Sequence, residues 1–248
     1  MQLTIDLNCD MGEGMPTDEL IMPFISSANI ACGYHAGDAD TIKRTIGLCL
    51  EHGVAIGAHP SFNDRDNFGR TETHLSDDAI YELVSEQLHF FRTYAGEMGA
   101  TIRHVKPHGA LYNMAARDQN LSRAIMRAIK DADPGLALYG LSGSCMIKEA
   151  FGFGLKIVHE VFADRTYQDD GSLTPRSQPG AFIESDAAAL QQVLQMIHHK
   201  TVTTRSGKII PIQADSVCIH GDGANAVAFA KTIHDHLKAH HIDIKTAW

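Results

Sequence analysis

The chain has 248 residues, of which 44% are hydrophobic and 21% are charged. This composition is typical of a globular protein with a sizeable core and excludes a disordered chain. The formal net charge is -9 and no basic cluster is present. Nucleic acids and acidic membrane surfaces are therefore poor partners, because both would be repelled.

The sequence carries no recognisable targeting or linker segment. It enters a strand-like alternation directly after Met1, without the basic and apolar regions of a secretory signal. No apolar stretch approaches the roughly 20 residues that cross a bilayer. The five cysteines are widely spaced and form no CxxC pair, which suits a reducing compartment. We expect a soluble cytoplasmic protein with one domain over residues 1–248.

Short β-branched or apolar runs recur along the chain, and most are followed by a polar loop and then by helical periodicity. Alternating strands and helices predict a parallel sheet, either doubly wound or closed into a barrel. Several expected helices begin with Ser or Asp, whose side chains cap free N–H groups. The expected strands are residues 3–8, 28–32, 54–57, 102–106, 136–140, 157–161 and 217–220, and the expected helices are residues 38–52, 76–98, 118–132, 142–151, 185–199 and 224–240.

Polar residues on one face of the strands favour the barrel. Alternate residues of a strand point to the same side, so Asp6, Asn8 and Asp10 share one face of the first strand, and His104 and Lys106 share one face of the fourth. In an open sheet helices cover both faces, which should then be apolar. We therefore predict a single-domain α/β barrel with a polar interior.

The connections that leave the expected strands are long, whereas most of those that leave the helices are short. The long ones are residues 9–18, 60–74, 107–117 and 163–180. Barrel enzymes carry their chemistry on the loops from strand to helix, so we expect an active site at this rim. Residues 201–213 are an exception, interpreted as a hairpin that turns near Ser206 and Gly207 and serves as structure or as a partner surface.

Two groups of polar side chains lie near the expected strand ends. Asp10 and Glu13 follow the first strand in the run DLNCDMGEG. Four interpretations of these carboxylates stay open: general bases, metal ligands, groups that bind a substrate amine, or turn residues that bind the backbone. His35 and His59 follow the next two strands at matching positions, and His108 follows the fourth. Matching histidines predict one shared site. No HExxH motif occurs, so no residue is assigned to a metal and the presence of one stays open.

Charged residues in the second half of the chain extend this set. Lys106 points inward, where it requires a carboxylate such as Glu160 or Asp6. We interpret residues 163–180 as a lid, in which Arg165 and Arg176 clamp a carboxylate or a phosphate. The run GDGANA at residues 221–226 nominally fits a dinucleotide fingerprint but lacks a following βα unit. No P-loop and no GxSxG elbow occur.

Long stretches of the sequence closely resemble the LamB/YcsF family, whose members are A subunits of 5-oxoprolinase. The similar stretches run from Ile5 to Asp222 and include IDLNCDMGEG, SANIACGYHAGD, GVAIGAHPSF, FGR, HVKPHGALYNMAARD, EVFADRTYQDDGSLTPRSQPGAFI and ADSVCIHGD. The resemblance implies a (β/α)7 barrel of the polysaccharide deacetylase and glycoside hydrolase type. Two departures are a short segment between Gly14 and Asp18, which puts the shape of one rim loop in question, and Gly223-Ala224 in place of a Thr-Pro type pair.

The resemblance further implies opening of 5-oxoproline to L-glutamate, coupled to hydrolysis of ATP with its Mg counter-ion, in a complex with two further subunits, B and C. As a hypothesis, Asp6 or His59 handles the proton or water, Lys106 and His108 stabilise the oxyanion, and Arg165 or Arg176 holds the carboxylate. The alternatives are a stand-alone metal-dependent deacetylase or amidase, and a non-catalytic subunit that delivers substrate. The predicted catalytic residues are Asp6, Asn8, His35, His59, Lys106, His108, Glu160 and His220, and the predicted substrate-binding residues are Asp10, Glu13, Asp164, Arg165, Arg176 and Asp222.

Overall fold

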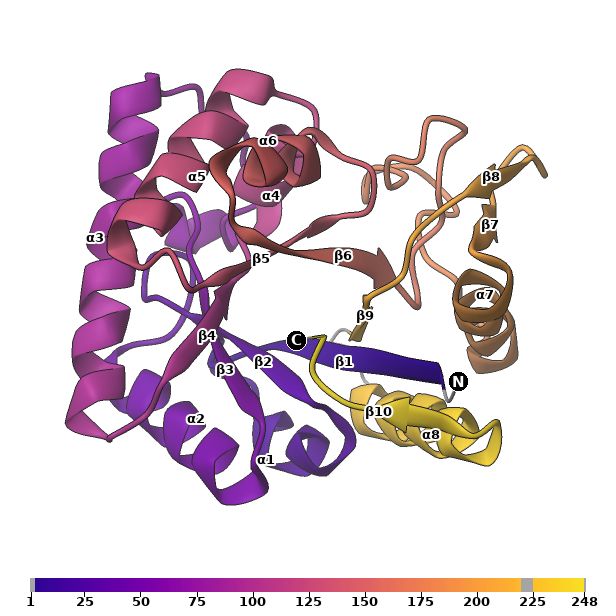
Figure 1. Cartoon of the computed structure of the whole chain (residues 1–248). Coiled ribbons are helices and arrows are strands. Elements are labelled where there is room, and N and C mark those ends of the chain that lie inside the picture. The colour runs from indigo at the N-terminus through magenta and orange to yellow at the C-terminus, as the bar shows by residue number, and fades with distance from the viewer. Residues whose placement is uncertain (1–2, 220–224, 248) are drawn as a thin grey trace.

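Seven parallel strands close into a barrel in the computed structural model, which describes residues 3–219 and 225–247 (Figure 1). Each strand pairs with the next along the chain, and the last pairs with the first. All seven predicted strands are confirmed. They are β1 (Leu3–Met11), β2 (Ser27–Ala31), β3 (Ala55–His59), β4 (Ile102–Val105), β5 (Ala137–Leu141), β6 (Lys156–Phe162) and β9 (Ser216–Ile219).

Six predicted helices surround the barrel (Figure 1). The side chains of Asp38, Ser76, Asp118 and Ser185 accept hydrogen bonds from the first turns of four of them, as their sequence positions predict. The fourth helix begins later than predicted, because the Ser142 hydroxyl accepts from a main-chain N–H across the fold instead of capping. The helices are α2 (Ala39–His52), α3 (Asp77–Glu97), α5 (Gln119–Ala132), α6 (Cys145–Phe153), α7 (Asp186–His199) and α8 (Ala226–Ala239).

Several short elements were not predicted. α1 (Asp18–Ile21), α4 (Gly109–Ala115) and the 3-10 turns η1 (Met22–Phe24) and η2 (Arg65–Asn67) lie in segments expected to be loops or left unassigned. They are too short for helical periodicity to be visible in sequence. β10 (Ile242–Ile244) pairs in parallel with the start of β1. The predicted hairpin is confirmed as the antiparallel pair β7 (Thr201–Thr203) and β8 (Ile209–Pro211).

The barrel interior is polar, whereas the layer between strands and helices is apolar. Inside the barrel, Asn29 donates to the Oδ1 atoms of Asn8 at 2.8 Å and of Asp10 at 2.9 Å. The ring of His104 lies 2.8 Å from Asn29 through Nε2. These side chains, except that of Asp10, are fully buried. The inward-facing polar residues predicted from the strand pattern therefore form a connected hydrogen-bond network. None of the helices within residues 3–219 and 225–247 is long and apolar enough to cross a membrane.

Gly57 in β3 makes room for this network. A Cβ at this position would lie 2.1 Å from Nε2 of His104, whose ring packs against Tyr139 with centroids 4.2 Å apart. Gly57→Ala should therefore lower the free energy of unfolding by about 3 kcal/mol, because an overpacked core forces strain. Guanidinium denaturation measures this, with Gly96→Ala in α3 as control. Apart from its chain neighbours and the backbone of its own helix, no heavy atom of the described residues lies within 4 Å of a Cβ at Gly96, so that change should be neutral or stabilising by up to about 1 kcal/mol. Equal stability of the two variants would contradict the clash.

A candidate active site at the carboxyl ends of the strands

A cavity of about 1170 Å³ is lined by the ends of β1, β3, β4 and β6 and by the loops that follow them. Residues 163–180, which were predicted to form a lid, contribute one wall. The hairpin contributes another through residues 208–212, so it is part of the cavity as well as of the surface. Seven Lys and Arg side chains and five carboxylates lie among the described lining residues. The cavity is thus more cationic than the chain, whose net charge is -9.

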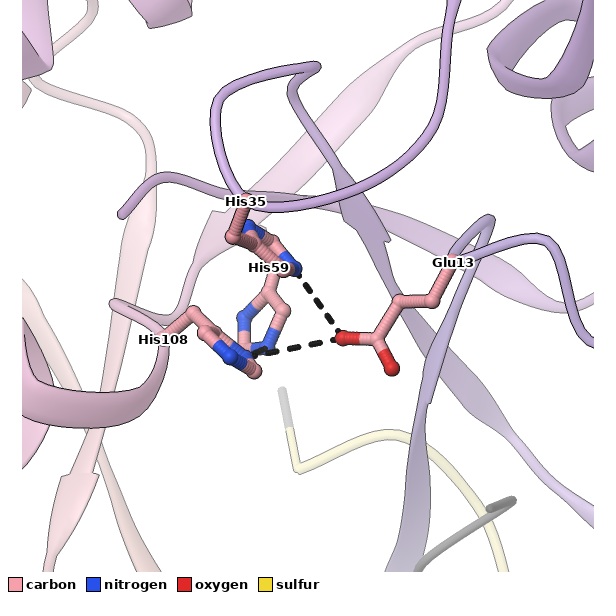
Figure 2. Close-up of side chains that lie close together, drawn as sticks. All are labelled: Glu13, His35, His59 and His108. Atoms are coloured by element: carbon pink, nitrogen blue, oxygen red, sulfur yellow. Dashed lines mark hydrogen bonds and ion pairs between the residues drawn. The ribbon is translucent and has the colours of Figure 1, made fainter. Parts of the chain in front are cut away.

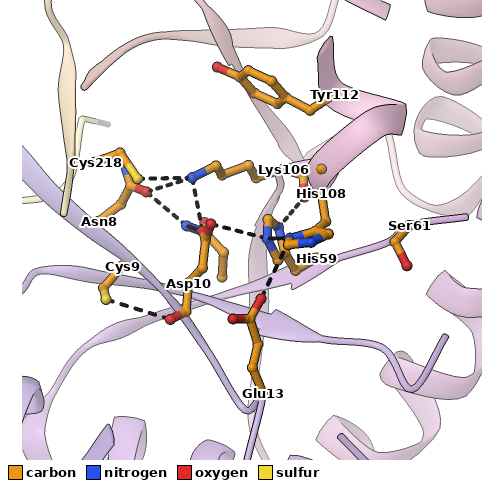
Figure 3. Close-up of polar contacts among 12 residues, drawn as sticks. Asn8, Cys9, Asp10, Glu13, His59, Ser61, Lys106, His108, Tyr112 and Cys218 are labelled. Atoms are coloured by element: carbon orange, nitrogen blue, oxygen red, sulfur yellow. Dashed lines mark hydrogen bonds and ion pairs between the residues drawn. The ribbon is translucent and has the colours of Figure 1, made fainter. Parts of the chain in front are cut away.

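A buried ammonium group stands at the base of this cavity (Figure 3). Nζ of Lys106 lies 2.9 Å from Oδ1 of Asp10 and 2.7 Å from Oε1 of Glu160. Burial alone would raise the pKa of Asp10, but His59 and Lys106 together hold that pKa well below its usual range. Burial would likewise lower the pKa of Lys106, yet Asp10, Cys218 and Glu160 raise it well above its usual value. The two side chains are therefore an ionised pair at neutral pH.

The contacts of Lys106 change its expected role. Its ammonium group also lies 3.2 Å from Oδ1 of Asn8 and 3.3 Å from Sγ of Cys218. With the two carboxylates this makes four acceptors for three N–H donors. The predicted direct hydrogen bond from Lys106 to an oxyanion is therefore not available in this arrangement. Lys106 instead fixes the orientation of Asp10, which lines the cavity.

Tyr112 completes this group and was not predicted. It lies in α4, lines the cavity, and donates through its hydroxyl to Oε2 of Glu160 at 2.6 Å. Burial and the nearby Glu160 raise the pKa of Tyr112 well above its usual value, so the hydroxyl stays a donor. The one indication in the sequence was its place inside the stretch HVKPHGALYNMAARD.

The three predicted histidines converge with Glu13 (Figure 2). Oε1 of Glu13 lies 3.0 Å from Nε2 of His35 and 3.5 Å from Nδ1 of His108. Nε2 of His59 lies 2.9 Å from Nδ1 of His108 and 3.3 Å from Oδ2 of Asp10. Burial lowers the pKa of His35 to about 2 and that of His108 well below its usual value. Both rings are therefore neutral.

His108 does not have the predicted hydrogen-bonding role. Its Nε2 lies 2.9 Å from the main-chain oxygen of Phe68, which can only accept. The single N–H of the neutral ring is therefore used there. The other nitrogen, Nδ1, carries a lone pair and cannot donate to an oxyanion.

Asp6 lies deeper in the barrel, among hydroxyl groups. It is fully buried and does not line the cavity. Its carboxylate accepts from Ser26 at 2.6 Å, from Ser27 at 2.7 Å, from Tyr139 at 2.9 Å and from Ser216. The geometry therefore gives Asp6 a structural position and separates it from any substrate in the cavity, in contrast to its predicted catalytic role.

The remaining predicted residues fall into three groups. Arg165 and Arg176 both line the cavity and stack on Phe182, each 5.1 Å from the ring centroid. Burial, and then the neighbouring Arg176, lower the pKa of Arg165 to about 10, so it remains charged. Asp164 does not line the cavity, and its main-chain oxygen accepts from Ile183. The predicted His220 and Asp222 lie outside the described residues.

Comparison with known proteins places this site in a family. The model of the LamB/YcsF family matches residues 5–248. The chain belongs to the LamB/YcsF family. Among curated relatives, the A subunit of 5-oxoprolinase from Tolumonas auensis is 49% identical over 246 residues, which cover 97% of this chain and 98% of that protein. The likeness therefore extends over nearly the whole chain, including the described site.

Solved structures confirm the predicted fold class. The lactam utilization protein of Thermus thermophilus matches this LamB/YcsF chain with a TM-score of 0.92 and 38% identity, over 98% of this chain and 100% of that one. The peptidoglycan deacetylase PdaC of Bacillus subtilis matches with a TM-score of 0.51 and 11% identity, over 99% and 88% of the two chains. At that identity the likeness concerns the barrel alone.

Proposed function

We propose that this chain is the A subunit of an ATP-dependent 5-oxoprolinase, which opens the lactam of 5-oxoproline to L-glutamate. The main observation behind this proposal is that Lys106 holds the ionised side chain of Asp10 at the edge of a cavity lined by more Lys and Arg side chains than carboxylates. The likeness to the Tolumonas auensis protein, which is named as the A subunit of 5-oxoprolinase, supports the choice of substrate. A lactam carrying a carboxylate is a small anion, which this cavity suits by charge.

Asp10 is the group placed to act on water. It is ionised and reaches the cavity, so it accepts a proton from a water molecule that attacks the lactam carbonyl carbon. A C–O bond forms, the ring C–N bond breaks, and the ring nitrogen takes up a proton to become the amino group of glutamate. Lys106 is a positioning residue in this scheme, because its donors are occupied by Asp10, Glu160 and their neighbours.

Arg165 and Arg176 are the groups placed to hold the anionic end of the substrate. The two guanidinium groups stand on the same aromatic ring with like charges close together. Arg165 is fixed by donation to the main-chain oxygens of Thr174 and Ala181. A carboxylate or phosphate between two guanidinium groups relieves their mutual repulsion and accepts charge-assisted hydrogen bonds.

ATP supplies the driving force in this proposal. A five-membered lactam re-forms easily, because its amine and carboxyl stay close together. Transfer of the terminal phosphate to the amide oxygen activates the carbonyl carbon. Attack by water and cleavage of the ring C–N bond then give the acyl phosphate of glutamate, which a second water molecule hydrolyses to glutamate and inorganic phosphate. We propose that MgATP is used by the assembled enzyme, which contains this chain and two further subunits, B and C, in the cytoplasm.

The test measures 5-oxoproline-dependent release of phosphate and glutamate. We expect neither product with this chain alone, and both when it is mixed with the two partner subunits and MgATP. Omission of this chain from the mixture should abolish glutamate formation. Full glutamate production by the two partners without it would overturn the proposal and support a role that only delivers substrate.

The cluster of three histidines and Glu13, together with the deacetylase-like barrel, favours a second candidate, a stand-alone metal-dependent amidase or deacetylase. Such an enzyme cleaves an amide without ATP or partners. Hydrolysis of 5-oxoproline or an N-acetyl substrate by the isolated chain in the absence of ATP would establish this candidate instead.

A further inference from the structure

We propose that Glu13, His35, His59 and His108 bind one divalent transition-metal ion of the zinc type. The four side chains come from the ends of different strands and present ligand atoms that all lie within 4.8 Å of one another (Figure 2). Metal binding at this cluster does not depend on which amide the cavity accepts. Instead, the hydrogen bonds that fix the orientation of each imidazole ring indicate a metal ion.

The hydrogen bonds of His59 and His108 leave two ring nitrogens facing each other. Nδ1 of His59 lies 2.6 Å from the main-chain oxygen of Lys106, and Nε2 of His108 lies 2.9 Å from that of Phe68. Carbonyl oxygens only accept, so each ring must place an N–H there. The other two nitrogens, Nε2 of His59 and Nδ1 of His108, then face each other at a separation of 2.9 Å. A cation beside them, either a shared proton or a metal ion, accounts for this close approach.

His35 is fixed in the same way. Its Nδ1 lies 2.9 Å from Oγ of Ser61, and that hydroxyl donates its one proton to the main-chain oxygen of Phe62 at 2.9 Å. Nδ1–H of His35 therefore donates to Ser61, and Nε2 presents a lone pair to the carboxylate of Glu13 at 3.0 Å. The side-chain amide of Gln87 fixes Ser61, because it accepts from the main-chain N–H of Ser61 and donates to the main-chain oxygen of Ser61.

This is the arrangement that metal-binding histidines show. Each ring donates its remote N–H to a fixed acceptor, which sets the tautomer and directs the other nitrogen at the ion. Three nitrogens and one carboxylate oxygen are a tetrahedral zinc set. With Zn–N bonds of about 2.0–2.1 Å, neighbouring ligand atoms stand about 3.3 Å apart. The contacts of 2.9, 3.0 and 3.5 Å within the cluster bracket that value.

The backbone around the cluster is specialised to hold these rings. Phe68, whose carbonyl fixes His108, has a left-handed φ of 56°, a strained conformation for a bulky residue that tends to occur at functional sites. A Cβ on the following Gly69 would lie 2.9 Å from Cβ of His35 and 3.0 Å from Cδ2 of His108. His35 and His108 therefore stack at 3.8 Å only because residue 69 has no side chain.

The experiment measures metal bound by the isolated full-length chain, without ATP or partners. After chelation and dialysis, Zn²⁺ is titrated by calorimetry and counted by elemental analysis, and Co²⁺ is added to a second sample for visible spectroscopy. We expect one ion per chain and the intense d–d absorption of a tetrahedral Co²⁺ site. X-ray absorption of the zinc form should show mainly nitrogen neighbours at about 2.0–2.1 Å.

Variants distinguish this cluster from adventitious sites. His35→Ala and His108→Ala should each lower Zn²⁺ affinity at least 100-fold and abolish the Co²⁺ absorption, whereas Ser61→Ala should lower affinity roughly 10- to 100-fold. The control is the double variant His236→Ala/His240→Ala. These histidines are exposed one turn apart on and just after α8, where a surface pair can also hold zinc. The control should keep the ion and its absorption.

Two results would overturn the proposal. One is no binding of Zn²⁺ or Co²⁺ to a folded chain, which would mean that a shared proton, and not a metal ion, joins His59 and His108. The other is full binding by both single-histidine variants with loss in the α8 control. Circular dichroism of each variant confirms that it is folded. No turnover is measured in this experiment, so a negative result for metal binding and a negative result in the 5-oxoprolinase assay can be told apart.

Discussion

Asp10→Asn should reduce glutamate formation by the reconstituted enzyme by roughly 10²- to 10⁴-fold, the range for loss of a positioned general base. The amide has nearly the same shape as the carboxylate but accepts no proton from water. Nζ of Lys106 would still be paired with Glu160 at 2.7 Å, so the buried ammonium keeps a counter-charge and the chain should remain folded. The deciding quantity is the turnover number for glutamate release, measured with 5-oxoproline, both partners and MgATP.

Asp38→Asn is the matched control for this change. Asp38 is exposed, lies outside the cavity and caps α2 by accepting from the N–H of Thr41. Asn caps a helix as well as Asp, so this variant should keep both activity and stability. An Asp10→Asn enzyme that retains the wild-type turnover number would remove Asp10 from the mechanism. The proton acceptor would then have to be sought elsewhere in the cavity, with His59 as the next candidate.

Asp6→Ala should lower the free energy of unfolding by about 3–5 kcal/mol. Four hydroxyl groups donate to this buried carboxylate, and deletion leaves them without their acceptor beside a new void. Asp6→Asn should cost much less, because serine hydroxyls can rotate to accept from the amide. Guanidinium denaturation checks both changes. Asp40→Ala, an exposed change in the first turn of α2, should shift stability by less than about 0.5 kcal/mol.

The same variants test the structural position of Asp6 by pH and by activity. Burial raises the pKa of Asp6 above its ordinary value of 3.8, so the folded state retains this proton more firmly than the unfolded chain. The contribution of Asp6 to stability should therefore fall as pH rises from 3.8 toward the raised pKa. Asp6→Asn should lack this dependence and keep turnover within a few-fold of wild type. A 100-fold loss of turnover in folded Asp6→Asn would instead restore the catalytic role predicted from sequence.

Local pattern alone predicted the seven strands, the six long helices and four of their caps, because periodicity and capping depend on neighbours in the chain. It also predicted that His35, His59, Lys106 and His108 share one rim, since parallel strands end on the same side of a barrel. The short α4, and with it Tyr112, left no such periodic pattern.

Only the tertiary structure distinguished Asp6 from Asp10. Both face inward on β1, but closure of the barrel places the first among hydroxyls of β2, β5 and β9 and the second at the cavity. The tertiary structure also decided that the ammonium group of Lys106 contacts Asn8, Asp10, Cys218 and Glu160. It brought three histidines that are distant in sequence together with Glu13. The sequence determines the type of each residue and its position along its strand. The pairing of atoms was set by strand register and barrel closure, which are long-range contacts that no local pattern encodes.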